Sequence, residues 1–354
     1  MTDSSGHGPT PPGAIVSPPH PHQMARMADG FGQRFILFVD TEEEFDWNAP
    51  FDRNARAVTH HRGLAEGQAR FASADVKPVY VIDHPIASDA NATAMLGQWA
   101  ADETCDVGAH LHPWVTPPHQ EEVCLRNSYA GNLPAALERA KLEALVEAIE
   151  RGTAVRPIAF RAGRYGAGPQ TAETLCDLGF RVDSSVRSRF DYRGQLGPDY
   201  HAFPLSPYWV GRDNALLELP LSTAFVGSLR GLGGPLHRFA EGKGRLAGAL
   251  SRLGLVARVP LTPEGVPVDE AIAAIDALIA DAVPLLSFSF HSPTLEAGHT
   301  PYVRDAADLR AFWAWWDKVL DHLARRGIAP ATLSEVIAAA NSCAKAQNSA
   351  CQAA

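Results

Sequence analysis

The sequence predicts an α/β fold, a distorted (β/α)7-type barrel in a single domain, and two observations carry this prediction. Short apolar runs alternate with segments of helical periodicity about seven times along the chain, a pattern typical of parallel strands joined by helices. No G-x-G-x-x-G follows an early strand, so an open dinucleotide-binding sheet is disfavoured and barrel-like closure is expected.

The first half of the chain contains the clearest strands, each a short apolar run that ends in polar residues. The expected strands there cover residues 35–39, 78–82, 105–109 and 156–160. The expected helices cover residues 59–74 and 133–151. The second helix has five apolar residues on one face, namely Leu137, Leu142, Leu145, Val146 and Ile149.

The second half continues the alternation with shorter strands. The expected strands cover residues 180–182, 216–219, 284–290 and 330–333. The expected helices cover residues 170–178, 235–253, 268–281 and 309–326. Gly179 is the expected C-cap of the first of these helices, Pro267 opens the third, and Ser334 is expected to cap a final helix.

Composition sets the expected limits of the domain. Residues 1–32 are rich in Pro, Gly and His and poor in apolar residues, which predicts a disordered tail. The domain is expected to span residues 33–340. The small and polar residues 341–354 predict a second, flexible tail.

Charge and composition exclude several classes of partner. The 354 residues have a formal net charge of -9, which argues against nucleic acid or an anionic membrane as the main partner. The five cysteines are odd in number and form no C-x-x-C pair, so no disulfide framework is expected. No secretory signal and no run of about 20 apolar residues is present. The sequence therefore predicts a cytoplasmic protein without a membrane span, and it leaves the oligomeric state open.

Ionisable residues stand directly after several of the expected strands. They are Asp40, His110, Arg161, Asp183 and His291. In parallel α/β folds, ligands bind at the carboxyl ends of the strands. We therefore expect these side chains to converge although they lie far apart in the sequence.

Asp40-Thr41-Glu42 places two carboxylates two residues apart. In extended backbone such residues point to the same side, and two close carboxylates favour a nearby cation. An acidic surface turn is the alternative, because more acidic residues follow. Arg161 would need an anion partner if it were buried, and Asp40 is a natural one.

His110-Leu111-His112 places two imidazoles on one side just past a strand, a common arrangement for holding zinc or a similar ion. A chance H-x-H is the alternative, since His20-Pro21-His22 has the same spacing. His291, a single histidine after its strand, could also be an ordinary buried core residue. Two His and one carboxylate together would leave open positions for water and substrate, which suits a catalytic metal.

These segments resemble, in order, the motifs of the polysaccharide deacetylases, the group with the NodB homology domain (carbohydrate esterase family 4). The resemblance covers about residues 34–338, and the chain looks most similar to the WalW-type branch. Asp40-Thr41-Glu42 stands at the first motif, 106–114 at the second, 160–166 at the third and Phe290-His291-Ser292-Pro293 at the last. The sequence departs from the family in two places. Thr41 separates the usually adjacent acids, and H-x-H replaces the usual H-x-x-x-H.

The resemblance implies a role for each candidate residue. Asp40 would be the catalytic base, Arg161 would hold Asp40, and His291 would be the acid. Glu42, His110 and His112 would hold one divalent ion, with Zn²⁺ as the first candidate and Co²⁺, Ni²⁺ or Mn²⁺ as alternatives. The expected substrate-binding residues are Arg164, Tyr165 and Trp114, with backbone N–H groups near the first two forming an oxyanion site. The family fold is a distorted (β/α) barrel of about seven strands, which agrees with the pattern above.

The implied activity is the hydrolysis of carbon–nitrogen bonds other than peptide bonds, namely the removal of N-acetyl (or O-acetyl) groups from a saccharide or glycan. A related metal-dependent hydrolase of a non-sugar amide is one alternative. A catalytically inactive saccharide-binding module is the other, although such a module needs neither Asp40 as base nor His291 as acid. The sequence does not identify the sugar or amide.

Overall fold

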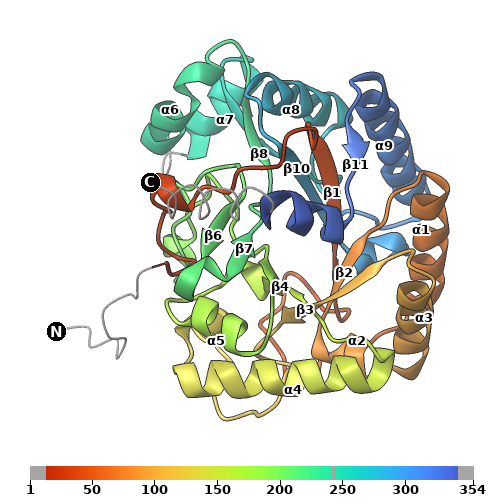
Figure 1. Cartoon of the computed structure of the whole chain (residues 1–354). Coiled ribbons are helices and arrows are strands. Elements are labelled where there is room, and N and C mark those ends of the chain that lie inside the picture. The colour runs from red at the N-terminus through yellow and green to blue at the C-terminus, as the bar shows by residue number, and fades with distance from the viewer. Residues whose placement is uncertain (1–12, 241–243, 342–354) are drawn as a thin grey trace.

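A curled, mostly parallel sheet lies at the centre of the molecule, with helices around its outside (Figure 1). The computed structural model describes residues 13–240 and 244–341. The strand order is β10-β1-β2-β3-β4-β5-β7-β6, with β11 paired to β1. All neighbours are parallel except the β6–β7 pair at the edge. The strands are β1 (Arg34–Thr41), β2 (Val79–Ile82), β3 (Asp106–Leu111), β4 (Ala159–Ala162), β5 (Val182–Asp183), β6 (Tyr208–Val210), β7 (Leu216–Glu218), β10 (Leu285–His291) and β11 (Ala329–Pro330).

The gap between β10 and the β5 side of the sheet is bridged by the segments that flank a separate antiparallel pair, β8 (Thr223–Val226) and β9 (Ala257–Pro260). The N–H of Leu221 donates to the carbonyl of Val186 at 2.9 Å, and the N–H of Ser222 donates to the carbonyl of Ser287 at 3.3 Å. These bonds join the two sides of the curled sheet. The α/β class, the single domain and the distorted, barrel-like curvature predicted from the sequence are confirmed.

Helices cover the outer face of the sheet (Figure 1). They are α1 (His61–Ser73), α2 (His84–Ser88), α3 (Ala90–Ala101), α4 (Ala135–Thr153), α5 (Thr171–Asp177), α6 (Gly233–Ala240), α7 (Gly244–Arg252), α8 (Val268–Ala280) and α9 (Ala306–Arg325). Apolar residues alternate along the strands between this outer layer and the interior of the barrel. In β1, Phe35 and Leu37 belong to the outer core, whereas Ile36 and Phe38 belong to the inner one.

The last helix, residues 333–341, packs on the inner core through Leu333, Val336 and Ile337. It is capped by Thr332 and not by Ser334, which corrects the sequence prediction. The N–H of Glu335 donates to Oγ1 of Thr332 at 3.2 Å, and the N–H of Thr332 donates to Oε2 of Glu335 at 2.8 Å. This reciprocal pair is a capping box, and it begins the helix where the expected strand 330–333 would have continued.

The segment 13–32 differs from the disordered tail expected over residues 1–32. Ile15 is fully buried, Met24 forms a β-bridge with Tyr208, and the N–H of Ala28 donates to the carbonyl of Ala339 at 3.1 Å. The prediction is therefore wrong for this stretch, because its few apolar residues pack on the sheet edge and the last helix. Residues 1–12 and the predicted tail over 342–354 lie outside the described residues.

Several further elements were predicted incorrectly or missed. The single helix expected over residues 235–253 is two helices, since α6 ends at Ala240 and α7 begins at Gly244. The strands β6, β8 and β9 were not predicted, nor were the helices α2 and α3. Within the described ranges, Cys105, Cys124 and Cys176 form no disulfide, and no helix is long and apolar enough to cross a membrane.

Candidate functional site

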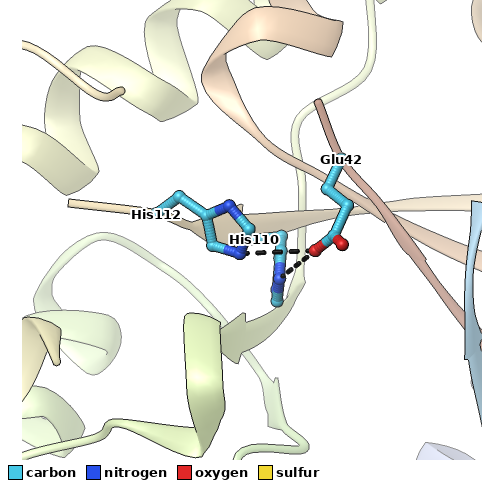
Figure 2. Close-up of side chains that lie close together, drawn as sticks. All are labelled: Glu42, His110 and His112. Carbon is cyan, nitrogen blue, oxygen red and sulfur yellow. Dashed lines mark ion pairs between the residues drawn. The ribbon is translucent and has the colours of Figure 1, made fainter. Parts of the chain in front are cut away.

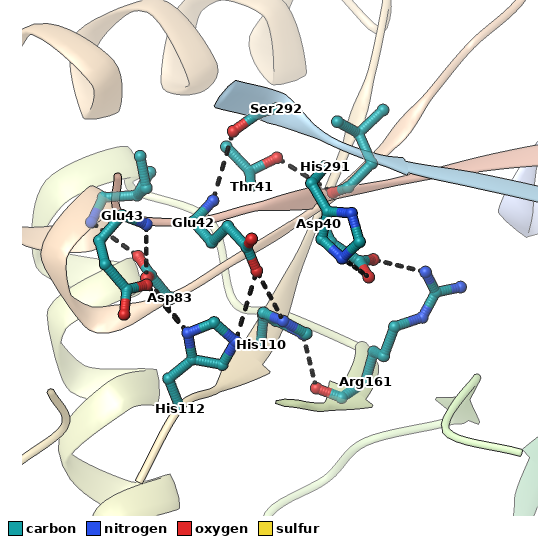
Figure 3. Close-up of polar contacts among 12 residues, drawn as sticks. Asp40, Thr41, Glu42, Glu43, Asp83, His110, His112, Arg161, His291 and Ser292 are labelled. Carbon is teal, nitrogen blue, oxygen red and sulfur yellow. Dashed lines mark hydrogen bonds and ion pairs between the residues drawn. The ribbon is translucent and has the colours of Figure 1, made fainter. Parts of the chain in front are cut away.

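Strand alternation brings polar side chains into the barrel at the carboxyl ends of four strands. Because Ile36 and Phe38 of β1 face the interior, Asp40 and Glu42 follow on the same side. The register pairs Asp40 with His291 of β10 and His110 of β3 with Arg161 of β4. Residues far apart in the sequence thus become neighbours at one end of the sheet (Figure 3).

Glu42, His110 and His112 form a buried cluster of potential metal ligands (Figure 2). Oε2 of Glu42 lies 3.5 Å from Nε2 of His110 and 3.3 Å from Nε2 of His112. All three side chains are at most 3% exposed, and Oε1 of Glu42 has no hydrogen-bond partner among the described residues. One carboxylate and two imidazoles with an unsatisfied oxygen fit a divalent ion such as zinc.

The second nitrogen of each histidine is already engaged. Nδ1 of His110 lies 3.0 Å from the carbonyl oxygen of Arg161, so this nitrogen carries the proton and donates it. Nδ1 of His112 lies 2.9 Å from Oε2 of Glu43. Such partners orient metal-binding imidazoles and leave Nε2 available as the ligand atom. Burial lowers the pKa of His110, and it lowers that of His112 to about 4, so both rings are neutral at pH 7.

Glu43 is a functional residue that the sequence analysis missed, because it was read as one member of an acidic turn. It is fully buried, and its Oε1 accepts a hydrogen bond from Nε1 of Trp114 at 2.9 Å. Its N–H donates to Oδ2 of Asp83 at 2.9 Å. Glu43, Asp83 and His112 are also close enough to hold an ion, but Nδ1 of His112 is hydrogen-bonded to Glu43. We therefore assign Glu43 and Asp83 to the support of His112 (Figure 3).

Asp40 is kept ionised by the arginine that lies beside it. Nη1 of Arg161 donates to Oδ1 of Asp40, and Arg161 is itself fixed by two 3.0 Å bonds to the carbonyl and hydroxyl oxygens of Ser184. Burial alone would raise the pKa of Asp40, but the charges of Arg161 and His291 help to outweigh burial, and the pKa is lowered. The carboxyl group of Asp40 is therefore a carboxylate at neutral pH.

His291 has the opposite electrostatic character and keeps its proton. Nδ1 of His291 lies 2.7 Å from Oε2 of Glu264, and its Nε2 lies 3.8 Å from Oδ2 of Asp40. Burial would lower the pKa of His291, but the charges of Glu264 and Glu42 raise it to about 10. Thr294 donates a 2.7 Å hydrogen bond that fixes Glu264. Glu264 follows β9, and no pattern in the sequence pointed to it because that strand was not predicted.

These side chains surround one cavity of about 320 Å³, near the lower end of the range for small-molecule sites. The predicted substrate-binding residues Trp114, Arg164 and Tyr165 line it, together with Trp47 and Tyr302. Arg164 and Tyr165 have left-handed backbone conformations with φ of 56° and 59°. Residues other than glycine rarely adopt this region unless the surrounding structure holds them there.

The structure brings together the nine site residues predicted from the sequence, since eight line the cavity and Arg161 lies behind Asp40. Asp183, the remaining strand-end residue, does not join them. Its Oδ1 accepts a 2.6 Å hydrogen bond from Ser185, and it forms a buried carboxyl pair with Glu218. Asp183 therefore belongs to the packing between β5 and β7.

No model of a known protein family matches the sequence, and no curated protein matches it. Several solved structures are similar in fold. A presumed polysaccharide deacetylase from Mycobacterium smegmatis matches at 16% identity and a TM-score of 0.46, over 90% of this chain and 98% of that one. A family 4 carbohydrate esterase from Streptomyces lividans, in complex with acetate, matches at 10% identity and a TM-score of 0.42, over 86% and 94%. A 4-alpha-glucanotransferase from Thermococcus litoralis matches at 12% identity and a TM-score of 0.51, over 89% of this chain and 40% of that one.

These similarities concern the fold and do not decide the reaction. Proteins that share a fold host different activities, so the function has to be argued from the chemistry of the site.

Proposed function

We propose that the protein is a metal-dependent carbohydrate deacetylase that removes N-acetyl (or O-acetyl) groups from a saccharide. The main support is the different environment of two carboxylates that stand two residues apart. Arg161 keeps Asp40 in its carboxylate form, and Asp40 faces a protonated His291. Glu42 instead faces two neutral imidazoles. A base, an acid and a ligand set in one cavity are the groups that metal-assisted amide or ester hydrolysis needs.

In this proposal Glu42, His110 and His112 hold one divalent ion, with zinc as the first candidate. The bound ion would supply Lewis-acid polarisation of the acetyl carbonyl and a lowered pKa for water. Asp40 accepts the proton of the attacking water, and Arg161 keeps its carboxylate oriented. In the same proposal His291 donates a proton to the leaving amine or alcohol, and backbone N–H groups near Arg164 and Tyr165 stabilise the oxyanion.

Metal content and acetate release test this proposal directly. The purified protein should contain about one zinc per chain and release acetate from N-acetylglucosamine oligomers or O-acetylated sugars. His110→Ala should lose both the metal and at least about a hundredfold in kcat, because the three-ligand set is broken. His322→Ala is the matched control, since His322 pairs with Asp276 on the outer helices. A metal-free protein whose His110→Ala variant keeps full activity would contradict the proposal.

The motif resemblance to the WalW-type branch of the polysaccharide deacetylases supports the same reaction. A non-sugar amide is the second candidate substrate, and the small, aromatic-lined cavity favours it over a long polymer. A panel of N-acetyl sugars and small cyclic amides separates the two, because only one class should be turned over. Saccharide binding without acetate release would instead indicate an inactive binding module.

A further inference from the structure

Two guanidinium groups line the cavity without a carboxylate partner in the described part of the chain. They belong to Arg164 and Arg187. The groups that face them are phenol and phenyl rings, a hydroxyl and an amide. Arginines in protein interiors normally pair with an anion, so a cavity that displays two such groups needs an explanation.

Arg187 follows β5 and is held by aromatic rings on two sides. Its guanidinium lies 4.1 Å from the ring centre of Phe190 and 5.0 Å from that of Tyr165. Nη1 donates a 3.2 Å hydrogen bond to the hydroxyl of Tyr192. A guanidinium has five N–H donors, so this arrangement fixes the plane of the fork while most of its donors remain available to a ligand.

Arg164 is held in a similar way on the other side of Tyr165. Nη2 donates to Oε1 of Gln195 at 2.8 Å, Nη1 donates to Oγ of Ser128, and the ring of Tyr129 lies 4.2 Å away. Its left-handed backbone conformation costs about 1 kcal/mol or more. The surrounding structure holds Arg164 in this conformation, and its side chain lines the cavity.

The other charged groups of the cavity are paired in all but one case. Asp40 pairs with Arg161 and Glu264 pairs with His291, whereas Glu42 faces two neutral imidazoles. One carboxylate therefore stands against the two guanidinium groups of Arg164 and Arg187, which leaves positive charge in excess, and a bound divalent ion would add to it. A partly enclosed cavity with an excess of one sign attracts ligands of the opposite sign.

We infer that the substrate carries an anionic group, a carboxylate or a phosphate, which Arg187 and Arg164 bind while the acyl group lies at Asp40 and His291. Arginine forks match both anions with paired hydrogen bonds. The position of the acyl group in this inference rests on the proposed function, whereas the binding of the anion does not. Anion binding by Arg187 can be tested whether or not acetate is released.

The experiment compares neutral and anionic probes on the zinc-loaded full chain. Calorimetry measures the binding of glucose, glucose 6-phosphate and glucuronate, and acetate release is followed with N-acetylglucosamine, its 6-phosphate and N-acetylmuramic acid. The anionic probes should bind and react at least about tenfold better than the neutral ones, since charge-assisted hydrogen bonds are lost with the neutral probe. Whether the phosphate or the carboxylate probe is preferred identifies the anion.

Variants test whether the two arginines cause the preference for anionic probes. Arg187→Met should remove it by about 10- to 100-fold, Arg187→Lys should keep part of it, and Arg164→Met should weaken it further. Arg189→Met is the matched control. Arg189 also binds a carbonyl, that of Thr223, and packs on the ring of Phe225, but it lines a different cavity. Unfolding curves of all variants show whether a loss of binding reflects a loss of structure.

The outcomes separate this inference from the proposed function. Anion binding that depends on Arg187, without acetate release from any sugar, supports the inference and contradicts the deacetylase proposal. Acetate release that is equal for neutral and anionic sugars overturns the inference and leaves the proposed function standing. Anion binding that is unchanged in both Arg187→Met and Arg164→Met places the anion on the metal, and this outcome also overturns the inference.

Discussion

At the scale of single residues, the proton on His291 depends on the carboxylate behind its ring. Glu264 lies 2.7 Å from Nδ1, and it is the main charge that raises the pKa of His291 to about 10 against the effect of burial. Because the folded pKa is above the ordinary value of 6.5, the pair stabilises the fold fully below pH 6.5. That contribution is lost as the pH rises through about 10.

Glu264→Gln should therefore lower the pKa of His291 and move the alkaline limb of kcat to lower pH, by about one to three units. A pH–rate profile of acetate release measures this shift, and Gln can still accept the hydrogen bonds of the His291 backbone and Thr294. Glu66→Gln on the surface of α1 is the control, since Glu66 pairs with Arg62 there. An unchanged alkaline limb in Glu264→Gln would show that His291 is not the group that titrates.

The residues that sequence reasoning found differ from those it missed in a simple physical way. Asp40, His110 and His291 stand directly after the short runs that predict strands, so their position in the sheet can be read from the sequence. Glu43 and Glu264 act through side-chain contacts with His112 and His291 that only the folded chain creates. No local pattern marks such a residue, because its partner is distant in the sequence.

At the scale of elements, the predicted strands differ from the missed ones in length and in their place in the sheet. β1 and β10 are long and apolar, and both were predicted. β6 has three residues and lies at the sheet edge, and β8 and β9 pair only with each other. The helix α2 was missed because it has only five residues and begins directly after the apolar run 78–82. Asp83 is in fact its N-cap, accepting a 2.9 Å hydrogen bond from the N–H of Ile86.

The helix α4 positions the loop that follows His112 through one buried lysine. Nζ of Lys141 donates to the carbonyl oxygens of Pro113 and Thr116 at 2.9 and 2.6 Å, and it lies 3.0 Å from Oε1 of Glu121. The side chain of Lys141 is fully buried, and that of Glu121 is 4% exposed. The lysine therefore links the outer helix layer to the segment that carries a proposed metal ligand.

Lys141→Met should destabilise the fold by about 1–3 kcal/mol, because two buried carbonyl oxygens lose their donor and Glu121 loses the nearer of its two cations, the other being Arg53 at 3.7 Å. Urea unfolding measures this change, and the double variant Lys141→Met/Glu121→Gln should recover part of the loss. Zinc affinity should fall as well, since the loop next to His112 loses its anchor. Lys318→Met on the exposed face of α9 is the control. A single variant as stable as the wild type would show that the loop is held by other contacts.

At the scale of the whole molecule, the two ends of the barrel have different roles. Inner positions near the amino ends of the strands are apolar and pack on the helix 333–341, whereas inner positions at the carboxyl ends are polar and line the cavity. Strand alternation decides which residues face the interior, and their place along the strand decides which end of the barrel they occupy. The sequence therefore predicted the location of the site more accurately than the connections between β7 and β10, where the strands are short and the segments irregular.

A bound ion would connect two strands that are not neighbours, since Glu42 follows β1, the two histidines belong to the end of β3, and β2 lies between them. Zinc should therefore raise the stability of the whole fold, by about 4 kcal/mol when free zinc exceeds its Kd about a thousandfold. Thermal unfolding with a chelator and then with added zinc measures the change in Tm.

Glu42→Gln supplies the decisive comparison for this linkage. The amide keeps the shape of the side chain but is a poor zinc ligand, so the variant should lose most of the zinc-dependent rise in Tm. With the chelator present the variant should be at least as stable as the wild type, because burying a neutral amide costs less free energy than burying a carboxylate. Glu66→Gln should keep the full rise. An equal zinc effect in Glu42→Gln and the wild type would place the ion away from Glu42, His110 and His112.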